Sequence, residues 1–292
     1  MKINILLTGC TGFLGGHLAR FWVQKGHHLT ALSSTCRRTP LLEPVYHEIE
    51  WVSYEKMNQA FTSRSYDALV HCAGSYGRKG ETEADLVDVN VRLGLKLLAE
   101  ANKRCIGKFI NAGSALPKLT SAYALSKAQF AEWMAFLSPR YKGALVYTRL
   151  QHMYGPCDDE TKFVTGILRK MLKNAPSIAL TRGDQERDFI FIDDVVSAFD
   201  TLLLHDLGVG FHEFDIGSGE AVSIRSLAEM IKNLCGSRSE LRFGAIQARS
   251  NEPDCLKADI SALAKLGWHC SAALEEGLRK TITAEQARPV EC

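Results

Sequence analysis

The chain has 292 residues, 46% of them hydrophobic, which is enough for a large core in one big domain or two interleaved ones. Its formal net charge of +2 excludes a strongly basic nucleic-acid-binding surface, and no apolar run is long enough to span a bilayer. The nine cysteines form no C-x-x-C pair and the nine histidines form no H-E-x-x-H motif, so we expect a reducing, cytoplasmic location and no metal site.

Short β-rich segments alternate with longer helical segments through the first half of the chain. The first segment lacks a small-residue cleavage site, so we expect a strand there and not a signal peptide. The predicted strands are Ile3–Leu7, Leu29–Leu32, Ala68–His71, Lys108–Asn111 and Ala144–Arg149. The predicted helices are Gly15–Lys25, Ala84–Asn102 and Tyr123–Leu137. Nearly all-apolar strands separated by helices predict an α/β fold, a Rossmann-type doubly wound parallel sheet.

The pattern changes after Arg149. The segment "QHMYGPCDDETKF" predicts a loop, "FHEFDIGSG" predicts a strand with a Gly-rich end, and "TAEQARPVEC" predicts a polar tail. Further helices are predicted at Thr165–Leu172, Ser223–Leu234 and Leu274–Ile282. We therefore expect a first domain over residues 1–156, which also takes strands from about 188–220, and a smaller mixed lobe over 157–292, interleaved with it.

Three glycines follow the first predicted strand and open the first predicted helix. Gly9 permits a sharp turn, Gly12 lets the backbone approach a pyrophosphate, and Gly15 allows close packing of helix on strand. Backbone N–H groups and the helix dipole favour an anion at this position. The placement of these glycines, more than their spacing, predicts a dinucleotide site and not a turn without a ligand.

The second predicted strand ends without an acidic residue. It ends at Ser33, and the next acid is Glu43, whereas an NAD site typically places a carboxylate there for the ribose 2′-OH. Ser33, Ser34, Arg37 and Arg38 would instead suit a 2′-phosphate, although a solvated basic turn is the alternative reading. We therefore expect NADPH as the cofactor, with NAD(H) as the alternative.

A tyrosine and a lysine at helical spacing follow the fourth predicted strand. Tyr123 and Lys127 are four residues apart and share one helix face. A free tyrosine titrates near pH ~10, and a nearby ammonium would lower that pKa by stabilising the phenolate. Tyr123 would then exchange a proton with a substrate carbonyl or hydroxyl, and Ser114 would hydrogen-bond the same oxygen. A Y-x-x-x-K pair also occurs on ordinary helix faces, so this interpretation depends on the surrounding residues.

Together these features resemble the extended short-chain dehydrogenase/reductases, or NAD-dependent epimerase/dehydratase family, that act on nucleotide sugars. The resemblance covers nearly the whole chain. Its other marks are "LVHCAG" (Leu69–Gly74), "DVNVRLGLKLLAEA" with Asn90, "YGP" (Tyr154–Pro156), "RDFIFIDDV" (Arg187–Val195) and "ADISALAKLGW". It implies that Asn90, Ser114, Tyr123 and Lys127 form the catalytic set, and that Lys127 also holds the nicotinamide ribose.

The resemblance also implies binding residues. Those expected to bind the cofactor are Gly9, Thr11, Gly12, Phe13, Leu14, Gly15, Ser33, Ser34, Arg37, Arg38, Cys72, Ala73, Gly74, Lys127, Gln151 and Met153. Those expected to bind the substrate are Ser75, Ser114, Tyr123, His152, Lys162, Phe163, Arg187, Arg249 and Glu252. Arg187 and Arg249 would bind a diphosphate by bidentate pairing, although a surface ion pair is the alternative for them, and a lone histidine such as His152 is often structural.

The loop between the serine and the tyrosine is short. Ser114 lies only nine residues before Tyr123, so a tight turn at Pro117 would be needed to bring them together. Ala115-Leu116 stand where the family's 4,6-dehydratases have an Asp-Glu pair, which argues against dehydration. The short loop and "QHMYGPCDDETKF" resemble the CDP-abequose synthase-like nucleotide-sugar 4-ketoreductases.

We therefore expect an NADPH-dependent 4-ketoreductase that reduces a nucleoside-diphosphate 4-keto-6-deoxyhexose, CDP- or dTDP-linked, for surface polysaccharide such as O-antigen. One alternative is an NAD-dependent nucleotide-sugar 4-epimerase, which uses the same residues. A second is a non-catalytic NADP-binding regulator. Besides the nucleotide sugar, the expected partner is a second copy of the chain, in a homodimer built from the helices that begin near Ala84 and Tyr123.

Overall fold

The computed structural model describes residues 2–248 and 251–288. The chain separates into two compact units, the first formed by Met1–Leu150 with Val196–Asp215 and the second by Gln151–Val195 with Ile216–Cys292. Within the described residues, no helix is both long enough and apolar enough to cross a bilayer.

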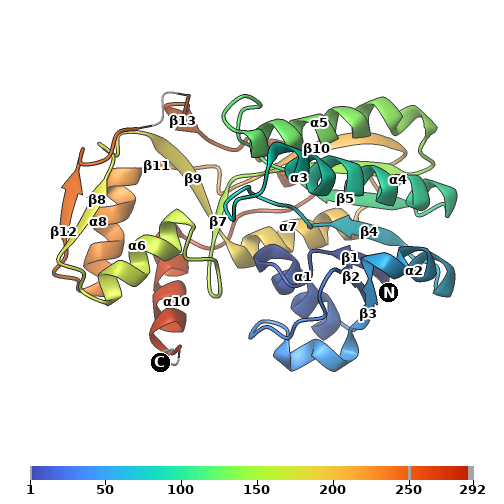
Figure 1. The fold of residues 1–292 in the computed structure, drawn as a ribbon, viewed down its shortest axis with the longest axis horizontal. Helices are drawn as coiled ribbons and strands as arrows, with labels where there is room; N and C mark the ends of the chain where they lie inside the picture. Colours follow the sequence, from blue (N-terminus) through green and yellow to red (C-terminus); the bar gives the residue numbers. More distant parts are fainter. Residues whose placement is uncertain (1, 249–250, 289–292) are drawn as a thin grey trace. The chain divides into compact units, whose positions relative to one another are not determined.

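A seven-stranded sheet forms the centre of the first unit, in the order β10-β6-β5-β4-β1-β2-β3 (Figure 1). Its strands are β1 (Asn4–Thr8), β2 (His28–Ser33), β3 (Glu50–Ser53), β4 (Ala68–His71), β5 (Lys108–Ala112), β6 (Ala144–Leu150) and β10 (Gly210–Ile216). Neighbouring strands from β3 to β6 pair in parallel. The predicted Rossmann-type parallel sheet is confirmed.

Helices cover both faces of this sheet. They are α1 (Phe13–Gln24), α2 (Met57–Ser63), α3 (Glu83–Val87), α4 (Leu93–Lys103), α5 (Ala122–Leu137) and α7 (Ile192–Leu204). Figure 1 shows α4 and α5 on one face and α1 and α7 on the other. Trp22 of α1 donates a hydrogen bond to Asp200 of α7 at 3.1 Å, so these two helices are joined by a buried polar contact as well as by packing.

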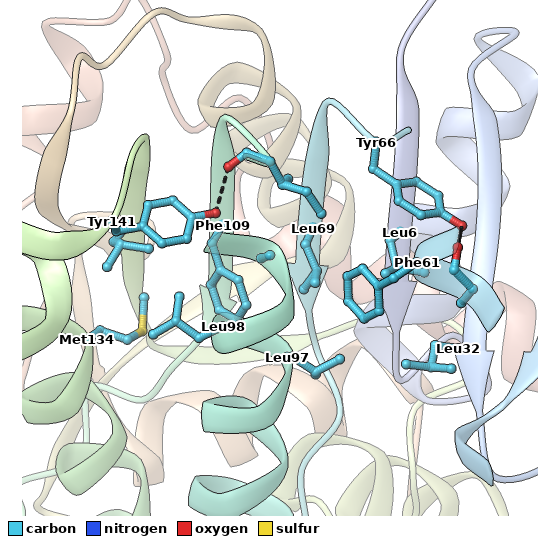
Figure 2. Close-up of a cluster of buried hydrophobic side chains, with 14 of the residues drawn as sticks. Leu6, Leu32, Phe61, Tyr66, Leu69, Leu97, Leu98, Phe109, Met134 and Tyr141 are labelled. Carbon is cyan, nitrogen blue, oxygen red and sulfur yellow. Dashed lines mark hydrogen bonds between the residues drawn. The ribbon is translucent and has the colours of Figure 1, made fainter. Parts of the chain in front are cut away.

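The main apolar cluster lies between the sheet and helices α2, α4 and α5 (Figure 2). Leu6, Leu69 and Phe109 project from neighbouring strands, which places them on one face of the sheet because side chains alternate along a strand. Leu98 of α4 and Met134 of α5 belong to the same cluster. Two residues further along, each of these strands reaches the carboxyl edge of the sheet, and the side chain at that position lies on the same face.

One predicted helix is interrupted. The segment expected to be a continuous helix over Ala84–Asn102 consists of α3, one π-helical turn at Asp88–Arg92, and α4. A π turn inserts an extra residue into the helical ladder and is frequent at functional sites. It carries Asn90 into the interior, where 1% of this residue is exposed.

The second unit contains two small sheets and four helices within the described residues. Its strands are β7 (His152–Tyr154), β8 (Ser177–Leu180), β9 (Glu186–Phe191), β11 (Ala221–Ser223), β12 (Glu240–Phe243) and β13 (Cys255–Leu256). Its helices are α6 (Phe163–Leu172), α8 (Ile224–Cys235), α9 (Ser261–Ala264) and α10 (Leu274–Gln286). Strand β9 pairs with β7, β11 and β13, and β8 pairs with β12.

Three expectations for the second half differ from the structure. The predicted loop after Leu150 contains β7, because this short segment finds a strand partner in β9. Helix α10 continues to Gln286, into the segment predicted to be a polar tail. Of the strands expected from about residues 188–220 to join the first domain, β10 joins the seven-stranded sheet, whereas β9 belongs to the sheet of the second unit.

Candidate functional site

The glycine-rich loop after β1 leaves no space for a side chain at two of its glycines. Gly9 has a φ of +73°, and a Cβ there would lie 2.6 Å from the backbone nitrogen of Ala73. A Cβ on Gly15 would lie 2.1 Å from the carbonyl oxygen of Gly9. The loop therefore packs directly against the segment after β4 and against its own first turn, which explains the expected roles of Gly9 and Gly15.

The beginning of α1 fits an anionic ligand. Gly12 is its N-cap, no side chain caps the helix, and no acidic residue lies in its first turn. The amides of Phe13 and Leu14 thus lack the side-chain acceptor that usually satisfies a helix N-terminus, and the helix dipole adds positive potential. Together with the compact glycine cradle, this arrangement suits the pyrophosphate of a dinucleotide. Thr11 lies half-buried beside it.

The segment after β4 is fixed to the same loop. Cys72 N–H donates to the carbonyl oxygen of Thr8 at 3.2 Å, and Ala73 N–H donates to Thr8 Oγ1 at 3.2 Å. Gly74 follows, and a Cβ there would lie 3.3 Å from Lys127 Nζ. The structure thus brings the three expected cofactor residues after β4 between the glycine loop and Lys127.

The four polar residues expected to bind a 2′-phosphate differ in availability. Ser33 is buried, and its hydroxyl donates to the carbonyl oxygen of Thr35 at 2.7 Å, so it does not offer a donor to a ligand. Ser34 and Arg37 are exposed, and Arg37 has no polar partner among residues 2–248 and 251–288. Arg38 contacts Glu43 at 3.3 Å. Ser34 and Arg37 are therefore the more accessible pair.

A tight turn brings Ser114 to Tyr123. The amide and the hydroxyl of Thr120 both donate to the carbonyl oxygen of Pro117, at 3.0 and 2.7 Å. Ser121 then caps α5 by accepting from Ala124 N–H at 3.1 Å, which places Tyr123 in the first helical turn. Ser114 Oγ accepts from Leu116 N–H at 3.2 Å, and Ser114 is close enough to Tyr123 to lower the pKa of its phenol. The short loop is thus compatible with a paired serine and tyrosine.

A second tyrosine fixes the Ser114 backbone. Tyr147 in β6 is 3% exposed, and its hydroxyl accepts from Ser114 N–H at 3.3 Å and donates to the carbonyl oxygen of Lys127 at 3.2 Å. Its ring fills the space beside Gly113, where a Cβ would lie 2.3 Å from Tyr147 Cζ. One phenol therefore ties the end of β5 to helix α5, a contact that the sequence pattern did not reveal.

Lys127 is buried at the centre of this region. Only 4% of it is exposed, and Nζ donates to the carbonyl oxygen of Ala112 at 2.7 Å. Burial lowers its pKa to about 8. The ammonium thus bonds the end of β5 and occupies the space into which a side chain at position 74 would project.

Asn90 joins two other segments. Its Oδ1 accepts from Ser75 N–H at 2.8 Å, and its Nδ2 donates to the carbonyl oxygen of Ser75 and to Ser126 Oγ, both at 2.9 Å. The side chain thus clamps both backbone groups of Ser75 and links them to α5. Ser75 Oγ in turn donates to Glu81 Oε1 at 2.8 Å, so this expected substrate contact is engaged within its own loop.

The prediction that a nearby ammonium lowers the pKa of Tyr123 is wrong. Burial raises this pKa well above its ordinary value, and Tyr76 and Tyr147 raise it further, while Ser114 lowers it. Lys127 does not offset these effects, because its ammonium is directed to Ala112. Tyr123 is therefore a protonated phenol at neutral pH.

In the second unit the structure brings together two of the expected substrate residues. Arg187 is 4% exposed, and its guanidinium lies 3.3 Å from Glu252 Oε2 and donates to the carbonyl oxygen of Glu186 at 2.7 Å. The adjacent Asp188, which the sequence analysis missed, is fully buried and accepts from the amides of Ser218, Gly219 and Ala258. Arg249 lies outside the described residues.

His152 lies near the same arginine. Its ring packs against Phe189 with centroids 5.5 Å apart, and burial, Arg187 and Lys162 lower its pKa to about 4. It is therefore neutral at physiological pH. Gln151 is 8% exposed and Met153 is half-buried in β7, and Phe163 is the first residue of α6. Two cationic side chains and a neutral imidazole thus lie in one region of the second unit.

No group of three or more His, Cys, Asp or Glu side chains that could hold a metal ion occurs in the part of the chain that the structure describes. Eight free cysteines lie in that part, from Cys10 to Cys270.

Comparison with known proteins gives a consistent picture. The model of the NAD dependent epimerase/dehydratase family matches residues 5–217. The chain is 30% identical to a CDP-abequose synthase from Salmonella muenchen over 97% of this chain and 98% of the relative. It is 25% identical to a putative UDP-glucose 4-epimerase from Methanocaldococcus jannaschii over 95% of this chain and 97% of that one.

Solved structures agree in fold. A UDP-glucose 4-epimerase from Thermotoga maritima, solved with UDP-glucose, has a TM-score of 0.86 at 21% identity and covers 97% of this chain and 99% of its own. A UDP-glucose 4-epimerase from Thermus thermophilus in complex with NAD has a TM-score of 0.85 at 22% identity, with coverage of 98% and 99%. At such identities the likeness concerns the fold alone.

Proposed function

Because the chain belongs to the NAD dependent epimerase/dehydratase family and is an extended short-chain dehydrogenase/reductase, we propose that it is an NADPH-dependent 4-ketoreductase. Its substrate is a nucleoside-diphosphate 4-keto-6-deoxyhexose, CDP- or dTDP-linked, and its product is an activated deoxysugar for surface polysaccharide. The observation that carries the proposal is the similarity to CDP-abequose synthase over 97% of this chain. The closeness of Ser114 to Tyr123 supports it, because a serine and a tyrosine that can reach one oxygen suit the reduction of a carbonyl.

Gly9, Gly12 and Gly15, with the amides that open α1, are proposed to hold the pyrophosphate. Lys127 is proposed to hold the nicotinamide ribose, since its buried ammonium lies beside Gly74 at the carboxyl edge of the sheet. When bound, NADPH supplies the hydride for sugar C4. A tightly packed cradle with uncapped amides favours this role over a turn that binds no ligand.

The preference for NADPH rests on the end of β2. Ser34 and Arg37 are exposed there, and Ser33 occupies the position at which a carboxylate would repel a 2′-phosphate. A guanidinium pairs with phosphate by two parallel hydrogen bonds, so Arg37 is the proposed main contact. Arg38 is a second contact only if it leaves Glu43.

Tyr123 is proposed to donate the proton to the alkoxide that forms at C4. Burial and Tyr76 raise its pKa, so the phenol keeps its proton at neutral pH, as a donor requires. Ser114 hydrogen-bonds the same oxygen and stabilises the tyrosinate left behind. Lys127, whose pKa burial lowers to about 8, is proposed to help restore the Tyr123 proton. Asn90 holds the Ser75 loop and α5 in place.

In the second unit, Arg187, Lys162 and the neutral His152 are proposed to bind the diphosphate of the substrate. Arg187 is already paired with Glu252 at 3.3 Å, so a diphosphate would compete for this guanidinium while Glu252 accepts from the nucleoside ribose. Phe163, Ser75 and the undescribed Arg249 complete the proposed substrate contacts.

The test is oxidation of NADPH followed by its absorbance, with CDP- and dTDP-linked 4-keto-6-deoxyglucose offered separately and NADH as the control. Fast oxidation with one of them supports the ketoreductase and identifies the nucleotide. If neither is reduced and the purified protein carries NAD, the 4-epimerase is the better account, as the similarity to the putative epimerase would allow. Binding of NADP without any turnover would support the non-catalytic regulator.

A homodimer is proposed from exposed apolar side chains on two helices of the first unit. On α5, Trp133 is 44% and Phe136 62% exposed, and Val87 of α3 is 43% exposed. Burying such aromatic side chains is a main source of affinity at interfaces. Light scattering on the wild type and on Trp133→Glu/Phe136→Glu tests this, with a dimer expected for the first and a monomer for the second.

A further inference from the structure

Arg187 lies in a strand whose neighbours on both sides are very short. In the second unit the strands run in the order β11-β9-β13 (Figure 1), and β11 and β13 have three and two residues. Arg187 of β9 pairs with Val222 of β11 on one side and with Leu256 of β13 on the other. Strands this short contribute few ladder hydrogen bonds, so other contacts are needed to hold them beside β9.

The residue after Arg187 supplies such contacts. Asp188 is fully buried, and its carboxylate accepts four hydrogen bonds from residues that the structure describes. Oδ1 accepts from the amide and the hydroxyl of Ser218, both at 2.7 Å, and Oδ2 accepts from the amides of Gly219 at 3.0 Å and Ala258 at 3.1 Å. These donors belong to the turn before β11 and to the segment after β13, so one side chain fastens both neighbours of β9.

The turn before β11 is pressed against this carboxylate. A Cβ on Gly217 would lie 2.5 Å from Asp188 Oδ2 and 2.6 Å from Ala258 Cβ. A side chain at position 217 would therefore push apart the turn, the carboxylate and the segment after β13. This contact lies on the face of β9 opposite to Arg187, because consecutive side chains of a strand point to opposite faces.

The segment that leads into β13 carries acceptors for the Arg187 guanidinium. Glu252 Oε2 lies 3.3 Å from Nη2, and the carbonyl oxygen of Asp254 accepts from Nη1 at 3.4 Å. The same carbonyl oxygen accepts from Glu186 N–H at 2.7 Å. The chain that presents these oxygens is thus attached to β9 before β13 by Asp254 and after β13 by its bond to Asp188.

We propose that Asp188 is a positioning residue for Arg187, because it holds both neighbours of β9 and thereby fixes the guanidinium and Glu252 for the diphosphate of a nucleotide substrate. This inference rests on the proposed function, in which Arg187 binds that diphosphate. Asp188 does not itself bind the ligand, since its buried oxygens are engaged by backbone and hydroxyl donors. It maintains the orientation in which two guanidinium N–H groups can pair with phosphate oxygens.

Asp188→Asn tests this with nucleoside diphosphates as probes. The amide offers one acceptor oxygen in place of two, so at least one backbone N–H loses its partner whichever way the amide faces. Calorimetry with CDP and dTDP, on the full chain saturated with NADPH, should show about three- to tenfold weaker binding of the tighter probe. Loss of a negative charge would by itself favour an anion, so weaker binding reports the altered geometry.

Arg187→Ala distinguishes this positional role from a general loss of structure. It should weaken binding of the same probe about 10- to 100-fold, as expected for loss of a hydrogen bond to a charged group. In the Arg187→Ala background, Asp188→Asn should have no further effect, because it acts through the guanidinium. Wild-type or tighter binding in a folded Asp188→Asn, or the same loss in both backgrounds, would overturn the proposal.

Asp194→Asn is the matched control. Asp194 is 2% exposed and accepts from the amide and the hydroxyl of Ser271 and from the amide of Ala272, at 2.9, 2.6 and 3.0 Å. The control should lower the free energy of unfolding as Asp188→Asn does and leave the affinity for the probe unchanged. Equal weakening of binding in Asp194→Asn would make loosening of the second unit the cause and would overturn the proposal.

A milder variant serves if Asp188→Asn does not fold. Ser218→Ala removes the hydroxyl that donates to Asp188 Oδ1 at 2.7 Å and keeps the carboxylate. It should weaken binding of the probe about twofold in the wild-type background and leave it unchanged in Arg187→Ala. Wild-type affinity in Ser218→Ala would then overturn the proposal.

Turnover separates this inference from the proposed function. Where the keto sugar is reduced, Asp188→Asn should raise its KM about three- to tenfold with little change in kcat, as expected for loss of binding alone. Failure of the ketoreductase assay would refute the proposed function and leave the binding results standing, because an epimerase also takes a nucleotide sugar. Absence of binding by both probes, or unchanged affinity in Arg187→Ala, would refute the diphosphate contact and this proposal with it.

Discussion

Replacing Tyr147 by phenylalanine tests how β6 supports the catalytic residues. The change removes one hydroxyl that is buried, accepts from Ser114 N–H at 3.3 Å and donates to the Lys127 carbonyl at 3.2 Å. It keeps the ring that packs on Gly113. Two buried hydrogen bonds are lost, and at about 0.5–1.5 kcal/mol each the free energy of unfolding should fall by ~1–3 kcal/mol.

Tyr141→Phe is the control for this variant. Tyr141 is also buried, and its hydroxyl donates to the carbonyl oxygen of Ile106 at 2.7 Å (Figure 2). Ile106 precedes β5, whereas Ser114 follows the other end of this strand. Its loss should lower the free energy of unfolding by about 0.5–1.5 kcal/mol and leave kcat unchanged. Tyr147→Phe should instead reduce kcat on the order of tenfold or more, because displacement of Ser114 misplaces a group that binds the reacting oxygen.

Urea denaturation and steady-state kinetics on the two variants and the wild type provide the measurements. The reasoning is refuted if Tyr147→Phe loses stability but keeps wild-type kcat, since the phenol would then be structural only. It is equally refuted if both variants lose kcat to the same extent.

Four further predictions concern the cofactor and the proton donor. Tyr123→Phe should bind NADPH normally and lose about 10²- to 10⁴-fold in kcat, measured by fluorescence titration and kinetics. Gly15→Ala should weaken NADPH binding at least about tenfold, because its Cβ would lie 2.1 Å from the Gly9 carbonyl oxygen and would force the loop to shift; calorimetry measures this. Arg37→Ala should raise the KM for NADPH about tenfold and leave that for NADH unchanged, since only the former carries the 2′-phosphate. The pKa of Lys127 falls from 10.5 to about 8 on folding, so the folded protein holds this proton less tightly than the unfolded chain does. Relative to Lys127→Met, the free energy of unfolding of the wild type should therefore rise on the order of 3 kcal/mol as pH rises from about 8 to 10.5. A difference in unfolding free energy between the two proteins that does not change with pH in denaturation experiments would contradict the buried ammonium.

Much of the first unit was predictable because its local signals agree with its tertiary structure. The apolar strand Ala68–His71 was predicted with the observed bounds, and the glycines after β1 occupy the turn that their order indicates. The break in the helix before α4 was not predicted, because a π turn leaves the apolar periodicity almost unchanged.

Contacts that depend on pairing of distant segments were harder to predict. Strand β7 is too short to stand out from its polar surroundings and exists because β9 is beside it. The Tyr76 ring stacks on the Tyr123 ring with centroids 4.6 Å apart, next to Ser75, whose N–H donates to Asn90, and no local pattern around Tyr76 reports this. The direction of the Tyr123 pKa was missed for the same reason, since helical spacing places Lys127 on the shared face but does not show that its ammonium donates to the carbonyl oxygen of Ala112.

The central claim is net transfer of hydride to the sugar, and deuterium transfer tests it most directly. The protein is mixed with NADPH that carries deuterium at the transferring position of nicotinamide C4 and with the nucleotide-linked 4-keto-6-deoxyhexose that it accepts, and the sugar product is analysed by mass spectrometry and NMR. The account predicts one deuterium on sugar C4 and one NADP⁺ formed for each sugar reduced. A sugar without deuterium, formed with no change in the oxidation state of the cofactor, would contradict it and identify an epimerase.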